Sequence, residues 1–139
     1  MKRYVVRWLA VSISAVAFAT AAWAQAADDV RKAFARQIYD AWPTAVHDNA
    51  PQPLLRAVVV LRVYLGDDGR WTAEVFRDNP NQPELTRKAL ESIARLPQPR
   101  DLAQEVADEL HRIGFVEAWL FENDGRFALR GVAKPQRAE

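Results

Sequence analysis

Two histidines and a few closely spaced acidic residues are the side chains of this sequence that could do chemistry. His47 lies in a proline-rich stretch beside Asp48, and His111 lies far along the chain beside Arg112. A histidine near carboxylates can act as a general acid or base, or can bind zinc. These two histidines lack the short spacing of a metal motif. We therefore expect a surface or capping role for each, with His111 stabilised at the C-terminal end of a helix.

Asp67 and Asp68 precede Gly69 in a sequence that resembles the start of a calcium loop. A calcium loop needs further acidic residues at fixed positions beyond its glycine, and they are missing here. The residues therefore predict a turn. The chain also has no cysteine nucleophile and no glycine-rich phosphate loop. We accordingly expect no enzymatic activity, no metal and no cofactor.

A further group of acidic residues lies on a predicted helix near the middle of the second half of the chain. Its members are Asp101, Glu105, Asp108 and Glu109. The spacing of four residues between some of these acids places them on one side of the helix. We favour a solvated helix face over a docking face for a basic partner.

Residues 1–24 have the three parts of a secretory signal peptide. Lys2, Arg3 and Arg7 form a basic start, an uncharged and alanine-rich run follows, and the small-x-small sequence Ala22-Trp23-Ala24 ends it. Hydroxyl side chains interrupt the apolar run, which suits a cleaved signal better than a permanent membrane anchor. We expect cleavage near Ala24 and export of the remaining chain.

After cleavage the chain, residues 25–139, would be nearly neutral. Three of the 19 basic residues lie in the predicted signal and all 18 acidic residues follow it, which leaves 16 basic residues and a net charge of −2. This balance gives no electrostatic reason to expect a nucleic-acid partner. Because cysteine is absent, the fold must depend on its apolar core. The length suits one domain with a modest core.

The hydrophobic patterns predict the element order α-β-β-α-α-β-β. The predicted helices cover residues 28–42, 83–96 and the stretch between Asp101 and Gly114, and the predicted strands cover residues 55–65, 71–77, 115–122 and 126–132. Aspartate-glycine turns join the strands into two hairpins. We expect a two-layer α+β domain, in which helices cover one face of an antiparallel sheet.

Polar residues at the predicted helix ends indicate where the helices begin and stop. Asp28 or Asp29 is expected to cap the first helix and Asp101 the third. Pro83 suits the first position of the second helix, and Gly114 suits the end of the third.

The predicted strands at residues 55–65 and 115–122 carry large apolar side chains on both faces. In the first strand, the set expected to face the helices is Val59, Leu61, Val63 and Leu65, and the other set is Val58, Val60, Arg62 and Tyr64. A sheet with one solvated face shows a cleaner alternation of apolar and polar residues. Either a helix or loop covers the second face, or an apolar patch there binds a partner. Because three amphipathic helices are available, we favour covering.

Four segments occur in an order and at spacings that fit a known family. They are Ile38-Tyr39-Asp40-Ala41-Trp42-Pro43, the strand and turn from Val58 to Gly69, Pro83-Glu84-Leu85 with Ala89-Leu90-Glu91-Ser92-Ile93, and Leu96-Pro97-Gln98-Pro99. Over most of residues 28 to 121 the chain resembles the C-terminal domain shared by the TolA and TonB energy-transducing proteins. The leading helix, and the extra helix after the prolines, fit the TolA type better.

This resemblance implies a domain that binds extended segments of envelope proteins, commonly by adding a strand at a sheet edge. The transducers of the family keep an uncleaved anchor and a long spanning segment, and the TolA domain often uses cysteines. This chain departs from the family in these respects. The resemblance therefore implies the binding habit of the domain and leaves a motor role unsupported.

We therefore expect a periplasmic protein-binding module whose partner is an envelope protein or a peptide segment. An edge strand, residues 126–132 or 71–77, would supply backbone hydrogen bonds. The residues expected at the binding surface are Tyr64, Trp71, Phe76, Trp119, Phe127, Ala128 and Arg130. We expect no stable membrane insertion after cleavage, and the oligomeric state stays open. The alternative is a small exported ligand-binding or inhibitory α+β module, which requires a closed apolar pocket between helices and sheet.

Overall fold

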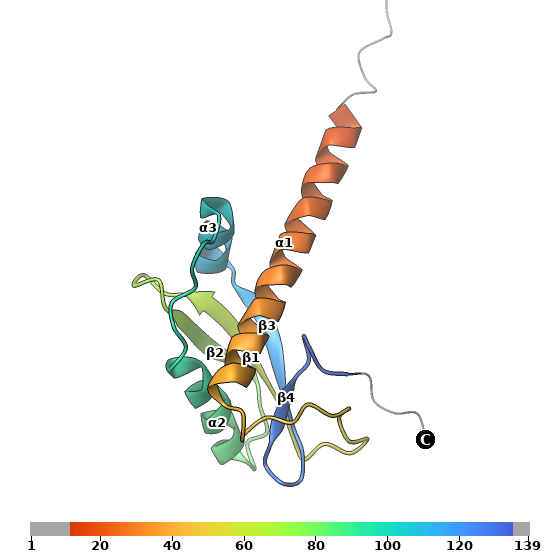
Figure 1. Ribbon diagram of the computed structural model, residues 1–139, viewed down its shortest axis with the longest axis vertical. Helices are drawn as coiled ribbons and strands as arrows, with labels where there is room; N and C mark the ends of the chain where they lie inside the picture. The colour runs from red at the N-terminus through yellow and green to blue at the C-terminus, as the bar shows by residue number, and fades with distance from the viewer. Residues whose placement is uncertain (1–11, 135–139) are drawn as a thin grey trace, which may run out of the picture.

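The computed structural model describes residues 12–134 of the chain (Figure 1). Its elements are α1 (Ser12–Ala41), β1 (Ala57–Leu65), β2 (Trp71–Arg77), α2 (Pro83–Ala94), α3 (Gln104–Arg112), β3 (Phe115–Phe121) and β4 (Phe127–Leu129). The order α-β-β-α-α-β-β and the mixed α+β class confirm the prediction. The residues expected to form a signal peptide, 1–24, lie partly outside the described residues, and residues 12–24 belong to α1.

The four strands form one antiparallel sheet in the order β2-β1-β3-β4. The central strand β1 pairs with β2, with Leu65 opposite Trp71, and with β3, with Val59 opposite Trp119. The two tight turns between neighbouring strands make the β1–β2 and β3–β4 hairpins, as expected for aspartate-glycine sequences. β2 and β4 are therefore the two edges of the sheet.

All three helices pack on one face of the sheet, and α1 crosses it diagonally (Figure 1). On β1 the buried side chains alternate with more exposed ones, so that Val59, Leu61 and Val63 face the helices as predicted. The opposite face, which we call the outer face, carries Val58 and Val116, each 39% exposed. The favoured expectation that a helix or loop covers this face is wrong for these positions, because the amphipathic helices use their apolar stripes on the other face.

An aromatic cluster fills the core between α1 and the sheet. The ring of Phe34 lies edge-on to Trp71 and Phe115, each with a centroid separation of 5.2 Å, and to Trp119 at 6.3 Å. Such arrangements place the positive ring edge against the negative ring face. The spacing of Val30, Phe34 and Ile38 on α1 thus packs the helix against the sheet.

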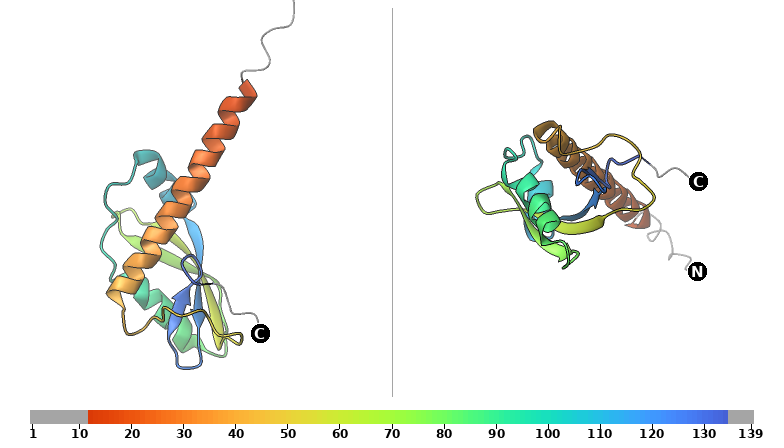
Figure 2. Two further views of the ribbon diagram at one scale, coloured as in Figure 1. Left: turned by 45° about the vertical axis from the view of Figure 1, so that its right-hand side comes forward. Right: turned by 90° about the horizontal axis from the view of Figure 1, so that it is seen from below.

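α1 begins earlier than the sequence pattern predicted. Asp28 and Asp29 lie inside a continuous helix that starts at Ser12, so neither residue caps it. Alanine has the highest helix propensity, which explains why the alanine-rich run continues the helix. The first half of α1 projects beyond the rest of the fold (Figure 2).

Several other boundaries also differ from the prediction, most clearly the start of α3 and the end of β4. α3 begins at Gln104 with Ala103 at its N-cap, and Asp101 instead adopts a left-handed conformation with φ of 58°. β4 ends at Leu129, because the Leu129 carbonyl accepts the N–H groups of Val132 and Ala133 in a turn.

Candidate functional site

The β4 edge of the sheet is closed by the segment that follows α1. The Phe127 N–H donates to the carbonyl of Ala45 (3.0 Å), and the Phe127 carbonyl accepts the N–H of His47 (3.1 Å). The Leu129 N–H donates to the hydroxyl of Tyr39 (3.0 Å). With the Leu129 carbonyl already used in the turn, every outward backbone group of Phe127 and Leu129 has a partner. A further strand has no free donors or acceptors to pair with here.

The β2 edge is open in the part of the chain that the structure describes. The Gly66 N–H donates to the Arg70 carbonyl (2.8 Å), so Gly66 and Arg70 form a hydrogen-bonded pair. Along an antiparallel ladder, such pairs alternate with pairs whose backbone groups point away from the neighbouring strand. Trp71, Ala73 and Val75 therefore point their backbone N–H and C=O groups away from β1. None of these groups has a hydrogen-bond partner among residues 12–134. Such a row of unpaired groups is a template for strand addition.

The side chains of β2 leave this edge accessible. Val75, on the helix-covered face, is 44% exposed, and Phe76, on the outer face, is 63% exposed. Thr72 and Glu74 are exposed as well. The end of β2 thus presents apolar surface on both faces of the sheet beside the unpaired backbone.

The structure divides the residues predicted for the binding surface into two groups. Trp71, Trp119, Phe127 and Ala128 are buried in the interior of the free chain. Ala128 pairs with Leu120, so its backbone groups face β3 and not the edge. The buried aromatic residues stabilise the core, and the sequence did not distinguish such strand aromatics from exposed ones.

The other predicted residues are accessible but do not lie together. The hydroxyl of Tyr64 donates to the Glu74 carboxylate (3.0 Å) on the outer face, close in sequence to the exposed ring of Phe76. Arg130 is exposed beyond the end of β4. Of the two edges that the sequence left open, the one at residues 71–77 has free outward backbone groups among the described residues, whereas those of Phe127 and Leu129 at the other edge are paired.

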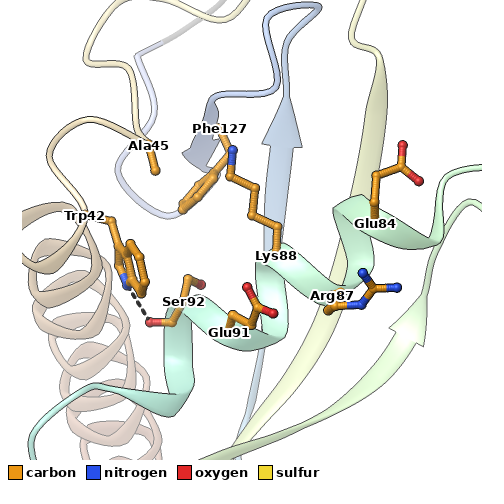
Figure 3. Close-up of a pocket in the computed structure, with 8 residues that line it drawn as sticks. All are labelled: Trp42, Ala45, Glu84, Arg87, Lys88, Glu91, Ser92 and Phe127. Carbon is orange, nitrogen blue, oxygen red and sulfur yellow. Dashed lines mark hydrogen bonds between the residues drawn. The ribbon is translucent and has the colours of Figure 1, made fainter.

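A cleft of about 310 Å³ lies between the end of α1, α2 and β4 (Figure 3). Its lining is mixed in charge and comprises Trp42, Ala45, Glu84, Arg87, Lys88, Glu91, Ser92 and Phe127. The indole N–H of Trp42 donates to the Ser92 carbonyl (3.1 Å) (Figure 3). The Lys88 ammonium group donates to the Gly125 carbonyl (2.6 Å). These two contacts join α2 to its neighbours, so Ser92 and Lys88 have structural roles at the cleft.

Ser92 is held by neighbours and is not an activated nucleophile. Its hydroxyl donates to the Ala89 carbonyl (2.6 Å) and accepts the indole N–H of Trp119 (3.0 Å). A nucleophilic serine instead needs an adjacent general base. Ser92 therefore serves as a hydrogen-bond junction between α1, α2 and β3.

A small apolar cavity of about 50 Å³ separates α1 from α3. Its lining includes Val30, Val106, Leu110 and Phe115. A water molecule occupies about 30 Å³ of the liquid, and ligand pockets measure about 300–1,000 Å³. This cavity is too small to be the ligand pocket that the alternative function requires.

The two histidines have structural surroundings that differ from each other. His47 is only 4% exposed, so the expected surface role is wrong. Its Nε2 lies 3.2 Å from Oε1 of Glu122. The same Oε1 accepts the Gln52 N–H. His111 is exposed at the end of α3, with Nδ1 3.0 Å from the Leu65 carbonyl and Nε2 3.4 Å from the Asp67 carboxylate. His47 therefore lies against the turn after β3, and His111 joins the end of α3 to the end of β1 and to the turn that follows it.

Within residues 12–134, no cluster of three His, Cys, Asp or Glu side chains is arranged to hold a metal ion, and no helix has the length and hydropathy needed to span a membrane. Comparison of the chain with protein-family models, curated proteins and solved structures gave no match. The function must therefore be argued from the surface of the molecule itself.

Proposed function

We propose that this chain is an exported protein-binding module, and that its β2 edge accepts an extended segment of an envelope protein as a fifth strand. The contrast between the two edges carries the proposal. The outward backbone groups of β4 are all paired within the chain, whereas those of Ala73 and Val75 on β2 have no partner among the described residues. Strand addition would satisfy them and supply affinity through main-chain hydrogen bonds.

Side chains on both faces of β2 would give the added strand its specificity. Alternate side chains of an added strand lie on opposite faces of the sheet. One set would lie beside Val75, and the other set would lie beside Phe76. Cross-strand apolar and aromatic pairs of this kind contribute about 0.2–1 kcal/mol each.

The resemblance to the TolA and TonB C-terminal domain supports the same class of partner. In that family the domain binds extended segments of envelope proteins. The signal-like sequence of residues 1–24 supports export to the compartment in which such partners are found. We therefore propose a periplasmic location and an envelope protein as the partner.

Proline at position 73 tests the proposal. The Ala73 N–H points away from β1, so Ala73→Pro removes a free edge donor without removing a bond of the sheet, a position where proline is tolerated. Photoreactive groups at Thr72 and Phe76 should capture an envelope protein from the source cell, and Ala73→Pro should reduce the capture at least about tenfold. The matched control is Thr72→Val, which keeps the backbone N–H and C=O groups of this residue. Capture by this variant is measured with the photoreactive group at Phe76.

A second proline substitution verifies the assignment of inward and outward groups. Glu74 is paired with Arg62 in the ladder, so Glu74→Pro should lower the thermal stability strongly, whereas Ala73→Pro should lower it only slightly. Undiminished capture by a folded Ala73→Pro variant would exclude strand addition at this edge.

A further inference from the structure

The outer face of the sheet has two halves with different surfaces. Over β1 and β2, the face is covered by its own side-chain pairs: the Arg62 guanidinium lies 5.6 Å from the centroid of the Phe76 ring, and the Tyr64 hydroxyl donates to Glu74. Over β1 and β3, the face carries aliphatic side chains. The two halves therefore present different chemistry to a partner.

The aliphatic half is hollowed into a groove of about 530 Å³, which we call the outer groove. Its floor consists of Val58 and Val60 from β1 and of Ala118 and Leu120 from β3. Pro51 and Leu55, from the segment before β1, and Ala133, from the turn after β4, also line it. The floor thus extends over two side chains on each of two neighbouring strands, about 5 Å across and 7 Å along them.

Three basic side chains stand around this floor. Arg77 comes from the end of β2, and Arg130 and Lys134 come from the turn after β4. All three are exposed, and none forms an ion pair with an acidic residue of the described chain. No acidic residue lines the outer groove. An apolar floor with an all-basic rim is complementary to an apolar surface flanked by carboxylates.

We infer that the outer groove binds an acidic amphipathic helix of a partner protein. The apolar stripe of the helix would lie on the floor, and carboxylates on its flanks would face Arg77, Arg130 and Lys134. A helix fits because its neighbouring apolar side chains on one face are about 5–6 Å apart, which matches the floor. The inference does not depend on strand addition at β2.

A designed peptide is the probe for this inference. It has about 14 residues, or four helical turns, with a leucine stripe flanked by glutamates and a fluorescent label. We expect saturable binding that weakens as salt is added, because exposed charges are screened. The Arg77→Glu, Lys134→Glu double variant should bind the peptide at least about tenfold more weakly. Arg130 is left unchanged because its charge also acts on the buried Glu117.

Matched controls separate this surface from general charge effects and from the β2 edge. Arg36→Glu, Arg100→Glu changes two exposed charges outside the groove and should bind the peptide normally. Ala73→Pro should also bind it normally, which keeps this test distinct from that of strand addition. The substituted arginine and lysine residues are exposed, and thermal melts verify that each variant folds.

Three results would overturn the inference. The first is equal binding of a peptide in which lysine replaces every glutamate, and the second is no binding of the acidic peptide at millimolar concentration. The third is binding of phosphatidylglycerol vesicles with the same sensitivity to Arg77→Glu, Lys134→Glu, which would assign the basic rim to an anionic membrane surface.

Discussion

Glu117 points from β3 into the side of the sheet that the helices cover, where a carboxyl group is costly to bury. Its side chain is 1% exposed; Oε1 accepts the N–H groups of Ala118 (2.8 Å) and Gly131 (3.1 Å), while Oε2 has no hydrogen-bond partner among the described residues. Burial raises the pKa of the Glu117 carboxyl, and the two backbone donors and the charges of Arg31 and Arg130 oppose that rise without cancelling it. Folding therefore makes the Glu117 carboxyl harder to ionise than it is in the unfolded chain.

The raised pKa of Glu117 predicts a fall in stability with rising pH. Because the folded chain holds this proton more tightly than the unfolded chain, its contribution is fully present below the unfolded pKa of about 4.5 and is lost as the pH rises through the folded pKa. Glu117→Gln has no proton to lose. We expect it to equal or exceed the wild type in unfolding free energy at neutral pH, by up to about 1–3 kcal/mol.

Urea unfolding at a series of pH values measures this effect. The wild type should lose stability between mildly acidic and neutral pH, and the Glu117→Gln profile should be flatter in that range. Parallel profiles for the two proteins would show that the Glu117 carboxyl ionises in the fold without a penalty.

At the scale of elements, the junction of α3 and β3 depends on Gly114. Its φ is +69°, and a Cβ at this position would collide with the Val63 carbonyl oxygen of the neighbouring strand. Gly69, in the β1–β2 turn, has a similar φ of +75°, but the nearest atom to an added Cβ is Nε2 of Gln98 at 3.8 Å. The two glycines share the backbone requirement and differ in available space.

Alanine at each of these glycines separates the two effects. Gly69→Ala should cost about 1 kcal/mol of unfolding free energy, because alanine disfavours positive φ. Gly114→Ala should cost about 1–3 kcal/mol more, because the clash with β1 forces the backbone to shift. Denaturant unfolding at one pH compares them, and equal losses would contradict the close approach at Gly114.

The sequence predicted the elements well and their ends less well, for a physical reason. Periodic apolar residues such as Val30, Phe34 and Ile38 report which side of a helix is buried, and this pattern was confirmed. Asp28 and Asp101 have cap-like identities, yet the backbone around them is set by the alanine-rich run before one and by the left-handed turn at the other. The type of a single residue does not show whether the backbone around it begins a helix.

The free edge could not be chosen from the sequence. The closure of β4 depends on two backbone hydrogen bonds that join segments far apart in the chain: the Phe127 N–H donates to the Ala45 carbonyl, and the His47 N–H donates to the Phe127 carbonyl. Similarly, the aromatic residues of the strands are alike in sequence, but Trp119 is buried and Phe76 is 63% exposed. Both distinctions arise from tertiary packing.

At the scale of the whole molecule, the packed domain does not need the first half of α1. That half projects from the fold (Figure 2), and Ala24 and Gln25 are exposed on α1 before the buried Phe34. Removal of the described part of α1 before Gln25 would therefore leave the core intact. We expect the protein purified from the envelope to begin at Gln25 or within a few residues of it. Intact-mass measurement tests this, and a retained N-terminus at Met1 would contradict the proposed cleavage.

In the free molecule, the two faces and the β4 edge of the sheet each differ from the β2 edge. Helices cover one face, the β4 edge is closed, and the outer face combines self-paired side chains with the outer groove. The β2 edge remains as the place where backbone groups are free among the described residues. Under the proposed function, an added strand would bind to the unpaired backbone groups of this edge.

Amide hydrogen exchange, followed residue by residue with and without the captured partner segment, tests the central claim most directly. We predict that binding slows exchange of the Ala73 and Val75 N–H groups, which point outward from β2, and leaves Phe127 and Leu129 on β4 unchanged. Protection confined to β4, or a bound partner with no change at Ala73 and Val75, would contradict strand addition at the β2 edge.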